Sequence, residues 1–313
     1  MKTIITEEMR FRQRVVKYAI KYNNNAKAAR RYHTSRQQVW RWRKKYDGTV
    51  QSLGNKSTRP NSHPKQHTQE EQDLIKHKYR YHGHEGYAQI YRNLKCAGYR
   101  RSYDSMCRQI RKMKLNRAED KVKSYPKSNY KKEAATYPGE RVQIDVKYVP
   151  VECIGFSSSN SRYYQITAID EYSRKRYLEL VNENSTYTTS RFLTRLEKNL
   201  GFKIDLVQTD NGLEFVNDPE RTNKKSRFQE TLEKLKIKHR RTRPYSPWQN
   251  GIVERSHRID NERFYNKRRF NSYEEMEKAF KRYANRYNKI AKKILNFKTP
   301  KEIVNEFNFK NIA

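Results

Sequence analysis

The sequence has little of what secreted, zinc-binding or membrane proteins need. It holds three cysteines in 313 residues, at positions 96, 107 and 153. An odd number of widely spaced cysteines predicts neither a disulfide framework nor a Cys-x-x-Cys zinc site. No apolar run approaches the length of a membrane span, and residues 1–8 lack the hydrophobic region of a signal peptide. We therefore expect a reduced, cytoplasmic location and no membrane partner.

Acidic residues are also scarce. The chain has 34 Asp and Glu against 70 Lys and Arg, which gives a formal net charge of +36. So much self-repulsion brings little benefit to a protein that only needs to be soluble. It favours salt-dependent attraction to phosphates without regard to sequence. The charge alone leaves open a ribosomal or chromatin-type protein without chemistry. It predicts a polyanionic partner and no small-molecule substrate.

Residues 1–47 predict a first DNA-binding domain of three short helices. A polar break separates the first two helices, and Thr34 or Ser35 is a plausible N-cap for a third over residues 36–46. A short helix, a turn and a helix that begins with Arg and Gln is the helix-turn-helix arrangement, whose second helix reads base edges. A small basic bundle that only holds the chain together is the alternative. The predicted DNA contacts are Arg36, Gln37, Gln38, Arg41 and Arg43.

Residues 48–67 are rich in Gly, Pro, Ser, Asn and basic side chains, which favours an extended linker along phosphates. We expect Arg59 to contact DNA there. Residues 68–115 repeat the three-helix pattern and predict a second helix-turn-helix domain. Its apolar Met106, Ile110 and Met113 have helical spacing and are expected in its core. The predicted DNA contacts of this domain are Arg101, Arg108 and Arg111.

After a second basic linker, residues 116–138, the periodicity changes to that of an α/β domain. We expect a core over residues 139–270, and further helices over residues 271–313 that complete it. The expected strands begin at residue 141 and cover 162–170, 175–181, 204–209 and 237–242; the expected helices cover 188–200, 228–235 and 273–290, with a short one from 299. Three strands followed by alternating helix and strand predict a mixed five-stranded sheet with helices on both sides.

Three acids stand in separate signatures of this core. Asp145 lies in Val142-Gln-Ile-Asp-Val146, where the alternation turns it away from the apolar face; Asp210 lies in Gln208-Thr-Asp-Asn-Gly-Leu-Glu-Phe215. Glu254 lies in Tyr245-Ser-Pro-Trp-Gln-Asn-Gly-Ile-Val-Glu-Arg255. Carboxylates are hard oxygen ligands that suit magnesium rather than zinc or copper. Two such ions can stabilise both the attacking and the leaving oxygen of an in-line phosphoryl transfer.

A capping box predicts where the helix of Glu254 begins. Ser246 would be its N-cap, with Pro247 at the first helical position and Gln249 reaching back, so that Glu254 lies about two turns into the helix. The predicted DNA contacts on this segment are Asn250, Arg255, His257 and Arg258. For His257 and the two arginines, a solvated basic face is the alternative. Trp248 and Tyr245 could stack on a base or pack under the helix.

Together these motifs resemble an insertion-sequence transposase of the DDE class, with a retroviral-integrase-like catalytic core on a ribonuclease-H-like fold. The segments that carry the resemblance are Gln143-Ile-Asp145, Thr209 to Phe215, Arg243 to Arg255, Lys298-Thr-Pro-Lys-Glu302 and the Arg59-Pro60 linker. They are spread over almost the whole chain, and their combination is far more specific than any one of them.

The resemblance implies that Asp145, Asp210 and Glu254 hold two Mg²⁺ ions, for which Mn²⁺ would substitute. It implies DNA cleavage at the terminal inverted repeats of a mobile element and strand transfer into target DNA. A homodimer or higher synaptic assembly in a prokaryotic, nucleoid-associated setting would do this. The alternatives are a structure-selective nuclease with the same metal site and a catalytically inactive DNA-binding regulator.

Some details of the chain depart from the family or compete with the three acids. Asp210 and Glu254 lie 44 positions apart (254 − 210), more than is usual for the family, and we expect the extra length in the polar loop 217–227. Glu214 is a rival third acid. Asp170 is expected to order a turn, with Arg174 as its suggested partner, rather than to bind metal. A zinc site of the retroviral-integrase type is not expected, because the spacing of the histidines and cysteines in residues 77–107 does not fit it.

Overall fold

The computed structural model describes residues 5–55, 60, 63–115, 133–156, 162–218, 220–243 and 246–312, apart from the side chains of residues 247, 311 and 312. The chain forms two compact units, residues 1–66 and residues 67–313. Each unit is described by itself. Arg59 and Tyr245 lie outside the described residues.

The first unit has the predicted helical plan. Its described helices are α1 (Glu7–Lys21), α2 (Asn25–Arg31) and α3 (Arg36–Lys45). The N-cap of α3 is Ser35, whose hydroxyl accepts a hydrogen bond from the backbone N–H of Gln38 at 3.1 Å. Val15, Ala28 and Val39, one from each helix, are fully buried together. The expected start of the third helix is confirmed, with Ser35 rather than Thr34 as its cap.

The second unit begins with another group of helices. These are α4 (Gln69–His82), α5 (Tyr87–Cys96) and α6 (Tyr103–Lys112). A capping box between Thr68 and Glu71 starts α4. Met106 and Ile110 are fully buried and Met113 is partly buried in the same cluster, as the helical spacing predicts. These helices belong to the same compact unit as the α/β core.

Side chains of these helices contact side chains of residues 286–302, in the C-terminal part of the chain. Arg92 forms a two-pronged ion pair with Glu302, and a hydrogen bond from Arg92 holds the pKa of that carboxyl at about 2. Buried Glu85 accepts hydrogen bonds from Arg286, one of them at 2.7 Å. Phe297 packs against the tyrosine rings of this helical group. A polar and aromatic seam therefore attaches residues 67–115 to the core.

The described part of the core contains a five-stranded sheet in the order β3-β2-β1-β4-β5. The strands are β1 (Val142–Tyr148), β2 (Tyr164–Asp170), β3 (Arg176–Val181), β4 (Leu206–Thr209) and β5 (Lys238–Arg241). β1, β2 and β3 pair antiparallel, whereas β4 pairs parallel to both β1 and β5. Parallel neighbours need a crossover, which helices supply here. The expected mixed sheet is confirmed.

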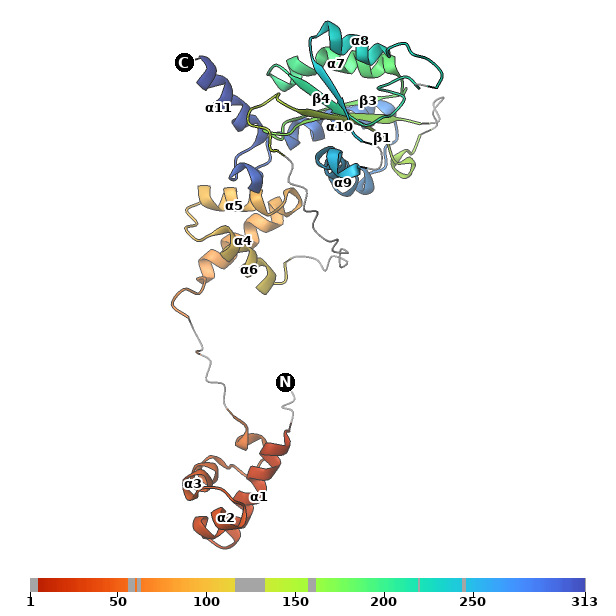
Figure 1. The fold of residues 1–313 in the computed structure, drawn as a ribbon. Helices are drawn as coiled ribbons and strands as arrows, with labels where there is room; N and C mark the ends of the chain where they lie inside the picture. Colours follow the sequence, from red (N-terminus) through yellow and green to blue (C-terminus); the bar gives the residue numbers. More distant parts are fainter. Residues whose placement is uncertain are drawn as a thin grey trace. The chain divides into compact units, whose positions relative to one another are not determined.

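Helices cover both faces of this sheet (Figure 1). Helices α7 (Thr186–Leu200) and α8 (Arg227–Lys234) pack on one face, over a cluster that includes fully buried Val142 and Ile144. Helices α9 (Gly251–Arg263) and α10 (Tyr273–Tyr287) pack on the other. The terminal helix α11 (Pro300–Ile312) is longer than the short helix expected there. The apolar period of β1 thus places its polar residues on the face that α9 covers.

Candidate active site

Two neighbouring parallel strands bring two of the predicted acids together, Asp145 from the middle of β1 and Asp210 from the residue after β4. In the register of β1 and β4, Gln143 lies opposite Gln208. Asp145 follows the first glutamine by two residues and Asp210 follows the second by two. Neighbouring strands are about 4.8 Å apart, and side chains two residues apart point to the same face. The repeated Gln-x-Asp pattern therefore puts the two aspartates side by side.

The two glutamines hold the start of α9 against the sheet. The side-chain amides of Gln143 and Gln208 both donate to the backbone carbonyl of Gln249, at 3.0 and 2.8 Å. Gln143 also accepts a hydrogen bond at 3.1 Å from the backbone N–H of Val253, one of the first N–H groups of the helix. Gln208 donates at 2.9 Å to the side chain of Asn250. We call these contacts the glutamine clamp.

The start of the helix differs from the predicted capping box. A 3₁₀ turn covers Pro247–Asn250, and its side-chain cap from Ser246 is absent among the described contacts. The Gln249 side chain accepts a hydrogen bond from the backbone N–H of Arg243 at 3.0 Å. Glu254 consequently lies in the first turn of α9, not two turns into it. The glutamine clamp therefore fixes the start of the helix, which is the role that the predicted capping box was expected to have.

The negative charges of the acids in the site raise one another's pKa. Burial, followed by the charge of Asp210 and the weaker effects of Glu214 and Glu254, raises the pKa of Asp145 to about 7. Burial and then Asp210 also raise the pKa of Glu254. Each aspartate keeps one oxygen on the backbone, Asp145 on the N–H of Val146 and Asp210 on that of Gly212. Negative charge is therefore concentrated here.

Glu214 remains a rival for the third acid. Burial and the charge of Asp210 raise its pKa, and its own charge acts on Asp145 more strongly than that of Glu254 does. It is half-buried, and its carboxylate lies where a Cβ on Gly212 would stand. Glu254, by contrast, is exposed.

The donor set fits a hard divalent cation, because it consists of carboxylate oxygens with uncompensated charge. Among the residues that the structure describes, no three His, Cys, Asp or Glu side chains are gathered closely enough to hold a metal ion. The carboxylates of Asp145 and Asp210 are held by hydrogen bonds to the backbone, whereas the side chain of Glu254 is exposed. A complete coordination sphere would thus require movement of a side chain.

His257 was expected to contact a DNA phosphate, but it faces the interior of the site. Its Nδ1 lies 3.4 Å from Asp145, and its Nε2 lies 2.9 Å from the hydroxyl of Thr167. Burial lowers its pKa to about 3, so that the ring is neutral. A neutral, largely buried imidazole does not serve as a cationic phosphate clamp, and the expectation is corrected on that ground.

Asn250 is a second correction. Its side chain is 4% exposed and accepts from Gln208, so it supports the helix rather than facing DNA. Arg255 and Arg258 are exposed on α9, as expected for phosphate contacts, and Arg258 also lies 3.6 Å from Glu262. Trp248 is 55% exposed, which favours stacking on a ligand over packing under the helix.

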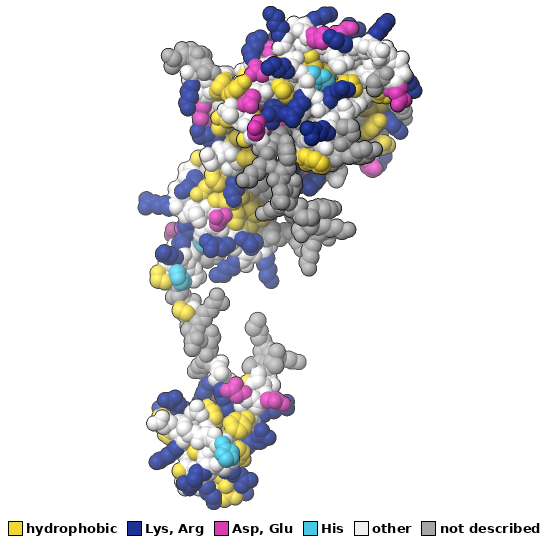
Figure 2. All heavy atoms as spheres, in the orientation of Figure 1, with side chains coloured by type: hydrophobic (Ala, Val, Ile, Leu, Met, Phe, Trp, Pro, Cys, Tyr) yellow, Lys and Arg dark blue, Asp and Glu magenta, His cyan; other side chains and the backbone are white. Residues whose placement is uncertain are grey.

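Some of the predicted DNA contacts of the helical domains are exposed, and others are held by structural partners. The exposed side chains are those of Arg36, Gln37, Gln38, Arg41, Arg108 and Arg111. Of these, Gln38 accepts a hydrogen bond from the Thr34 hydroxyl at 2.7 Å, and Arg111 donates to the Cys107 carbonyl at 3.4 Å. Arg43 donates to Asn23 and Asn25, and Arg101 forms an ion pair with Glu71 at 2.8 Å. Figure 2 shows Lys and Arg spread over the visible faces rather than gathered in one patch. Arg43 and Arg101 therefore have structural partners already.

Asp170 orders a turn, as predicted: the backbone N–H of Arg174 donates to its carbonyl at 3.1 Å, and its carboxylate accepts from other residues. One oxygen accepts from the backbone N–H and the hydroxyl of Ser173, at 2.7 and 2.6 Å, and the other from the N–H of Gly139 at 3.0 Å. In the loop between Asp210 and α8, Asn217 donates to the carbonyl of Lys224 at 3.0 Å. This hydrogen bond links the two ends of the loop segment 217–224.

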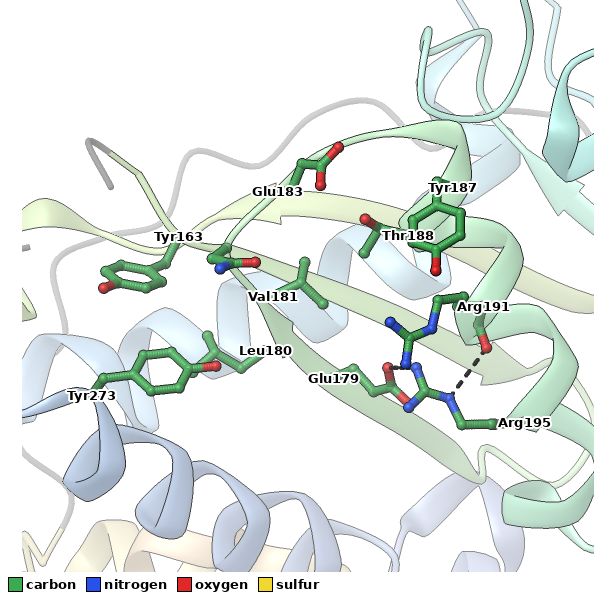
Figure 3. Close-up of a pocket in the computed structure, with 11 residues that line it drawn as sticks. Tyr163, Glu179, Leu180, Val181, Glu183, Tyr187, Thr188, Arg191, Arg195 and Tyr273 are labelled. Carbon is green, nitrogen blue, oxygen red and sulfur yellow. Dashed lines mark hydrogen bonds and ion pairs between the residues drawn. The ribbon is translucent and has the colours of Figure 1, made fainter. Parts of the chain in front are cut away.

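The pocket in Figure 3 lies elsewhere. It has a volume of about 440 Å³ and lies between β3, the start of α7 and α10, where Arg195 pairs with Glu179. None of the predicted site residues lines it. In the part of the chain that the structure describes, no helix is long and apolar enough to cross a membrane.

Sequence comparisons match two parts of the chain to known families. Residues 135–247 and residues 235–292 match two models described as integrase core domain, and residues 11–60 match a helix-turn-helix domain. A curated relative, "Putative integrase ORF3" of Spiroplasma virus SpV1-C74, is 29% identical over 180 residues. The match covers 54% of this chain and 47% of the relative, so the chain spans about half the length of that protein.

Comparison of structures finds retroviral proteins. The simian T-cell lymphotropic virus intasome in complex with PP2A regulatory subunit B56 gamma has a TM-score of 0.45 and 16% identity, over 70% of this chain and 74% of that one. The catalytic core domain of BIV integrase has a TM-score of 0.41 and 18% identity, over 56% and 99%. The HTLV-2 integrase core in complex with magnesium has a TM-score of 0.38 and 21% identity, over 54% and 97%.

Proposed function

Since this chain is a member of the integrase-core proteins and carries a helix-turn-helix domain, we propose that it is a DDE transposase. It binds the ends of a mobile DNA element, cuts there and joins the ends to target DNA. The observation that carries the proposal is the pair of Gln-x-Asp segments on neighbouring parallel strands, with the start of the helix of Glu254 hydrogen-bonded to both glutamines. Exposed Arg255 and Arg258 lie on the same helix.

Asp145, Asp210 and Glu254 would hold the divalent cations, two Mg²⁺ ions per site with Mn²⁺ as a substitute. Magnesium bound there would activate the attacking oxygen and stabilise the departing 3′-oxygen. In the first step a water oxygen forms a bond to phosphorus while the bond to the 3′-oxygen breaks. In the second, the freed 3′-hydroxyl attacks a phosphodiester of the target, and the displaced 3′-oxygen leaves.

The chain's other residues position DNA for these steps. The exposed Arg and Gln side chains at the start of α3 are placed to read base edges, while Arg255 and Arg258 contact phosphates beside Glu254. Because strand transfer acts on two DNA ends together, a homodimer or higher assembly is the proposed active form. The proposed setting is the prokaryotic cytoplasm, at the nucleoid.

The alternatives make different predictions in one assay. The full chain is incubated with Mg²⁺ and linear DNA that carries the terminal repeats of its native locus, and both nicking and joining are scored. We expect nicks at the repeat ends followed by joined products. Nicking without joining would identify a structure-selective nuclease, and binding without nicking would identify a DNA-binding regulator.

A further inference from the structure

His257 lies between the candidate site and a buried polar network on the same face of the sheet. Its Nδ1 points to the Oδ2 atom of Asp145 at 3.4 Å, and its Nε2 to the Oγ1 atom of Thr167 at 2.9 Å. The first distance is longer than an ordinary N–H···O hydrogen bond. Such contacts are often long in unliganded enzymes and shorten when the site is filled. The ring is therefore in place to hold Asp145.

The hydrogens of the network decide which ring nitrogen carries a proton. The amide of Gln165 donates one hydrogen to the carboxylate of Asp260 at 2.8 Å and the other to Thr167 at 2.9 Å. Its oxygen accepts from Tyr265 at 2.7 Å. Because Thr167 accepts from Gln165, its own hydroxyl hydrogen is available for the Nε2 atom of His257. In a neutral ring the proton then lies on Nδ1, toward Asp145.

A buried ion pair anchors the far end of this chain of contacts. Arg176 and Asp260 are 2.7 Å apart, and both side chains are 0% exposed. Ser256 and Tyr283 add hydrogen bonds of 2.7 and 2.6 Å, and the Arg176 guanidinium lies 3.6 Å from the ring centre of Tyr287. A buried pair of this kind gains little stability over apolar residues of equal size, but breaking it is costly. It is suited to fixing orientation.

We propose that His257 is a positioning residue for Asp145. Its Nδ1–H holds the carboxylate oxygen, and the sequence Thr167, Gln165 and Asp260 fixes the plane of the imidazole ring. The catalytic consequence rests on the proposed function, whereas the hydrogen-bond arrangement does not. Outer contacts of this kind to ligating side chains commonly change metal affinity or activity by about 10–100-fold.

Two substitutions of His257 separate the two ring nitrogens. Asparagine places its amide N–H near the position of Nδ1 and can still donate to Asp145. Glutamine reaches the position of Nε2 and keeps the contact with Thr167, but it has no donor at Nδ1. We expect His257→Gln to weaken Mn²⁺ binding by the full chain about tenfold or more, with a matching loss of DNA cleavage. We expect His257→Asn to retain most of both.

The tautomer can be observed without metal, DNA or activity. In ¹⁵N-histidine-labelled full chain, the His257 signal is identified by its loss in the asparagine variant. We expect the long-range ¹H–¹⁵N spectrum to show a proton on Nδ1 in the wild type. Thr167→Val, which removes the hydroxyl donor and leaves His257 and Asp145 in place, should lower the fraction of the Nδ1–H form relative to the wild type. This variant also serves if a His257 variant does not fold.

The outcomes distinguish the two proposals. A wild-type proton on Nε2, or equal Mn²⁺ affinity of the glutamine and asparagine variants, would overturn the positioning role. If the wild-type chain binds Mn²⁺ and shows the expected tautomer but never cuts DNA, the transposase proposal fails and the positioning of Asp145 stands.

Discussion

The strand acids and the helix acid of the candidate site are held in different ways. Asp145 lies within β1 and Asp210 directly follows the neighbouring strand β4, and one carboxylate oxygen of each accepts a hydrogen bond from a backbone N–H. Glu254 is exposed in the first turn of α9, and its position depends on the glutamine clamp rather than on a contact of its own carboxylate. The sheet thus fixes Asp145 and Asp210, whereas helix α9 positions Glu254.

The largest expected effect tests whether both kinds of acid are needed. Asp145→Asn, Asp210→Asn and Glu254→Gln should each reduce cleavage and joining by more than about 100-fold, beyond the usual loss at supporting residues. DNA binding, measured at fixed salt, should change little because the DNA-reading side chains are untouched. A variant that cuts DNA at near wild-type rate would remove that acid from the site.

The next effect tests the dependence of the helix on the strands. Gln143→Leu and Gln208→Leu break the glutamine clamp, and we expect a loss of activity of about 10–100-fold with faster hydrogen exchange in residues 249–254. Gln229→Ala is the matched control, because it removes a capping contact of α8 away from the site. The control should cost stability, about 1 kcal/mol, without a comparable loss of activity. Equal activity losses in all three variants would contradict a specific role for the clamp.

A smaller effect distinguishes the two candidate glutamates. Glu214 lies four positions after Asp210 and influences Asp145 electrostatically, yet it is not on the clamped helix. We expect Glu214→Gln to retain cleavage within about one order of magnitude, because it removes charge without removing the proposed ligand. Measured beside Glu254→Gln under the same Mg²⁺ concentrations, the reverse ranking would assign the third position to Glu214.

The smallest effect follows from the raised pKa of Asp145, about 7 in the folded protein against an ordinary value of 3.8. A raised carboxyl pKa means that the folded state binds the proton more tightly, so the metal-free protein loses stability as pH rises from about 4 to about 7. Asp145→Asn should therefore raise the Tm at pH 8 by a few degrees, near the 2–4 °C that about 1 kcal/mol gives in a domain of 150–250 residues. The difference should shrink at pH 5. A lower Tm for the variant at pH 8 would contradict this.

Local patterns in the sequence predicted the fold well. The alternation around Asp145 predicted its strand and its direction away from the apolar face, and the spacing of Met106 and Ile110 predicted a core helix, because both signals are local periods of the chain. The predicted side-chain cap from Ser246 was wrong, and the N–H of Val253 in the first turn of α9 instead donates to Gln143, 110 residues away. Such long-range contacts leave no local trace.

The sequence predicted the candidate site only in part, because local motifs identify the acids but long-range contacts orient their neighbours. The acids stand in recognisable motifs, but the burial of Asn250 and the inward direction of His257 depend on β1, β2 and β4. One available signal was missed. The Gln-x-Asp pattern occurs on two strands, and a period of two puts each glutamine on the face of its aspartate.

The central claim is that strand and helix acids converge on a shared divalent cation. The most direct measurement is the anomalous scattering of Mn²⁺ in crystals of the full chain bound to its terminal DNA. The account predicts peaks within about 2.0–2.2 Å of carboxylate oxygens from Asp145, Asp210 and Glu254, the distance range of small octahedral cations. Bound DNA with the Mn²⁺ elsewhere, or with Glu254 outside its coordination sphere, would contradict it.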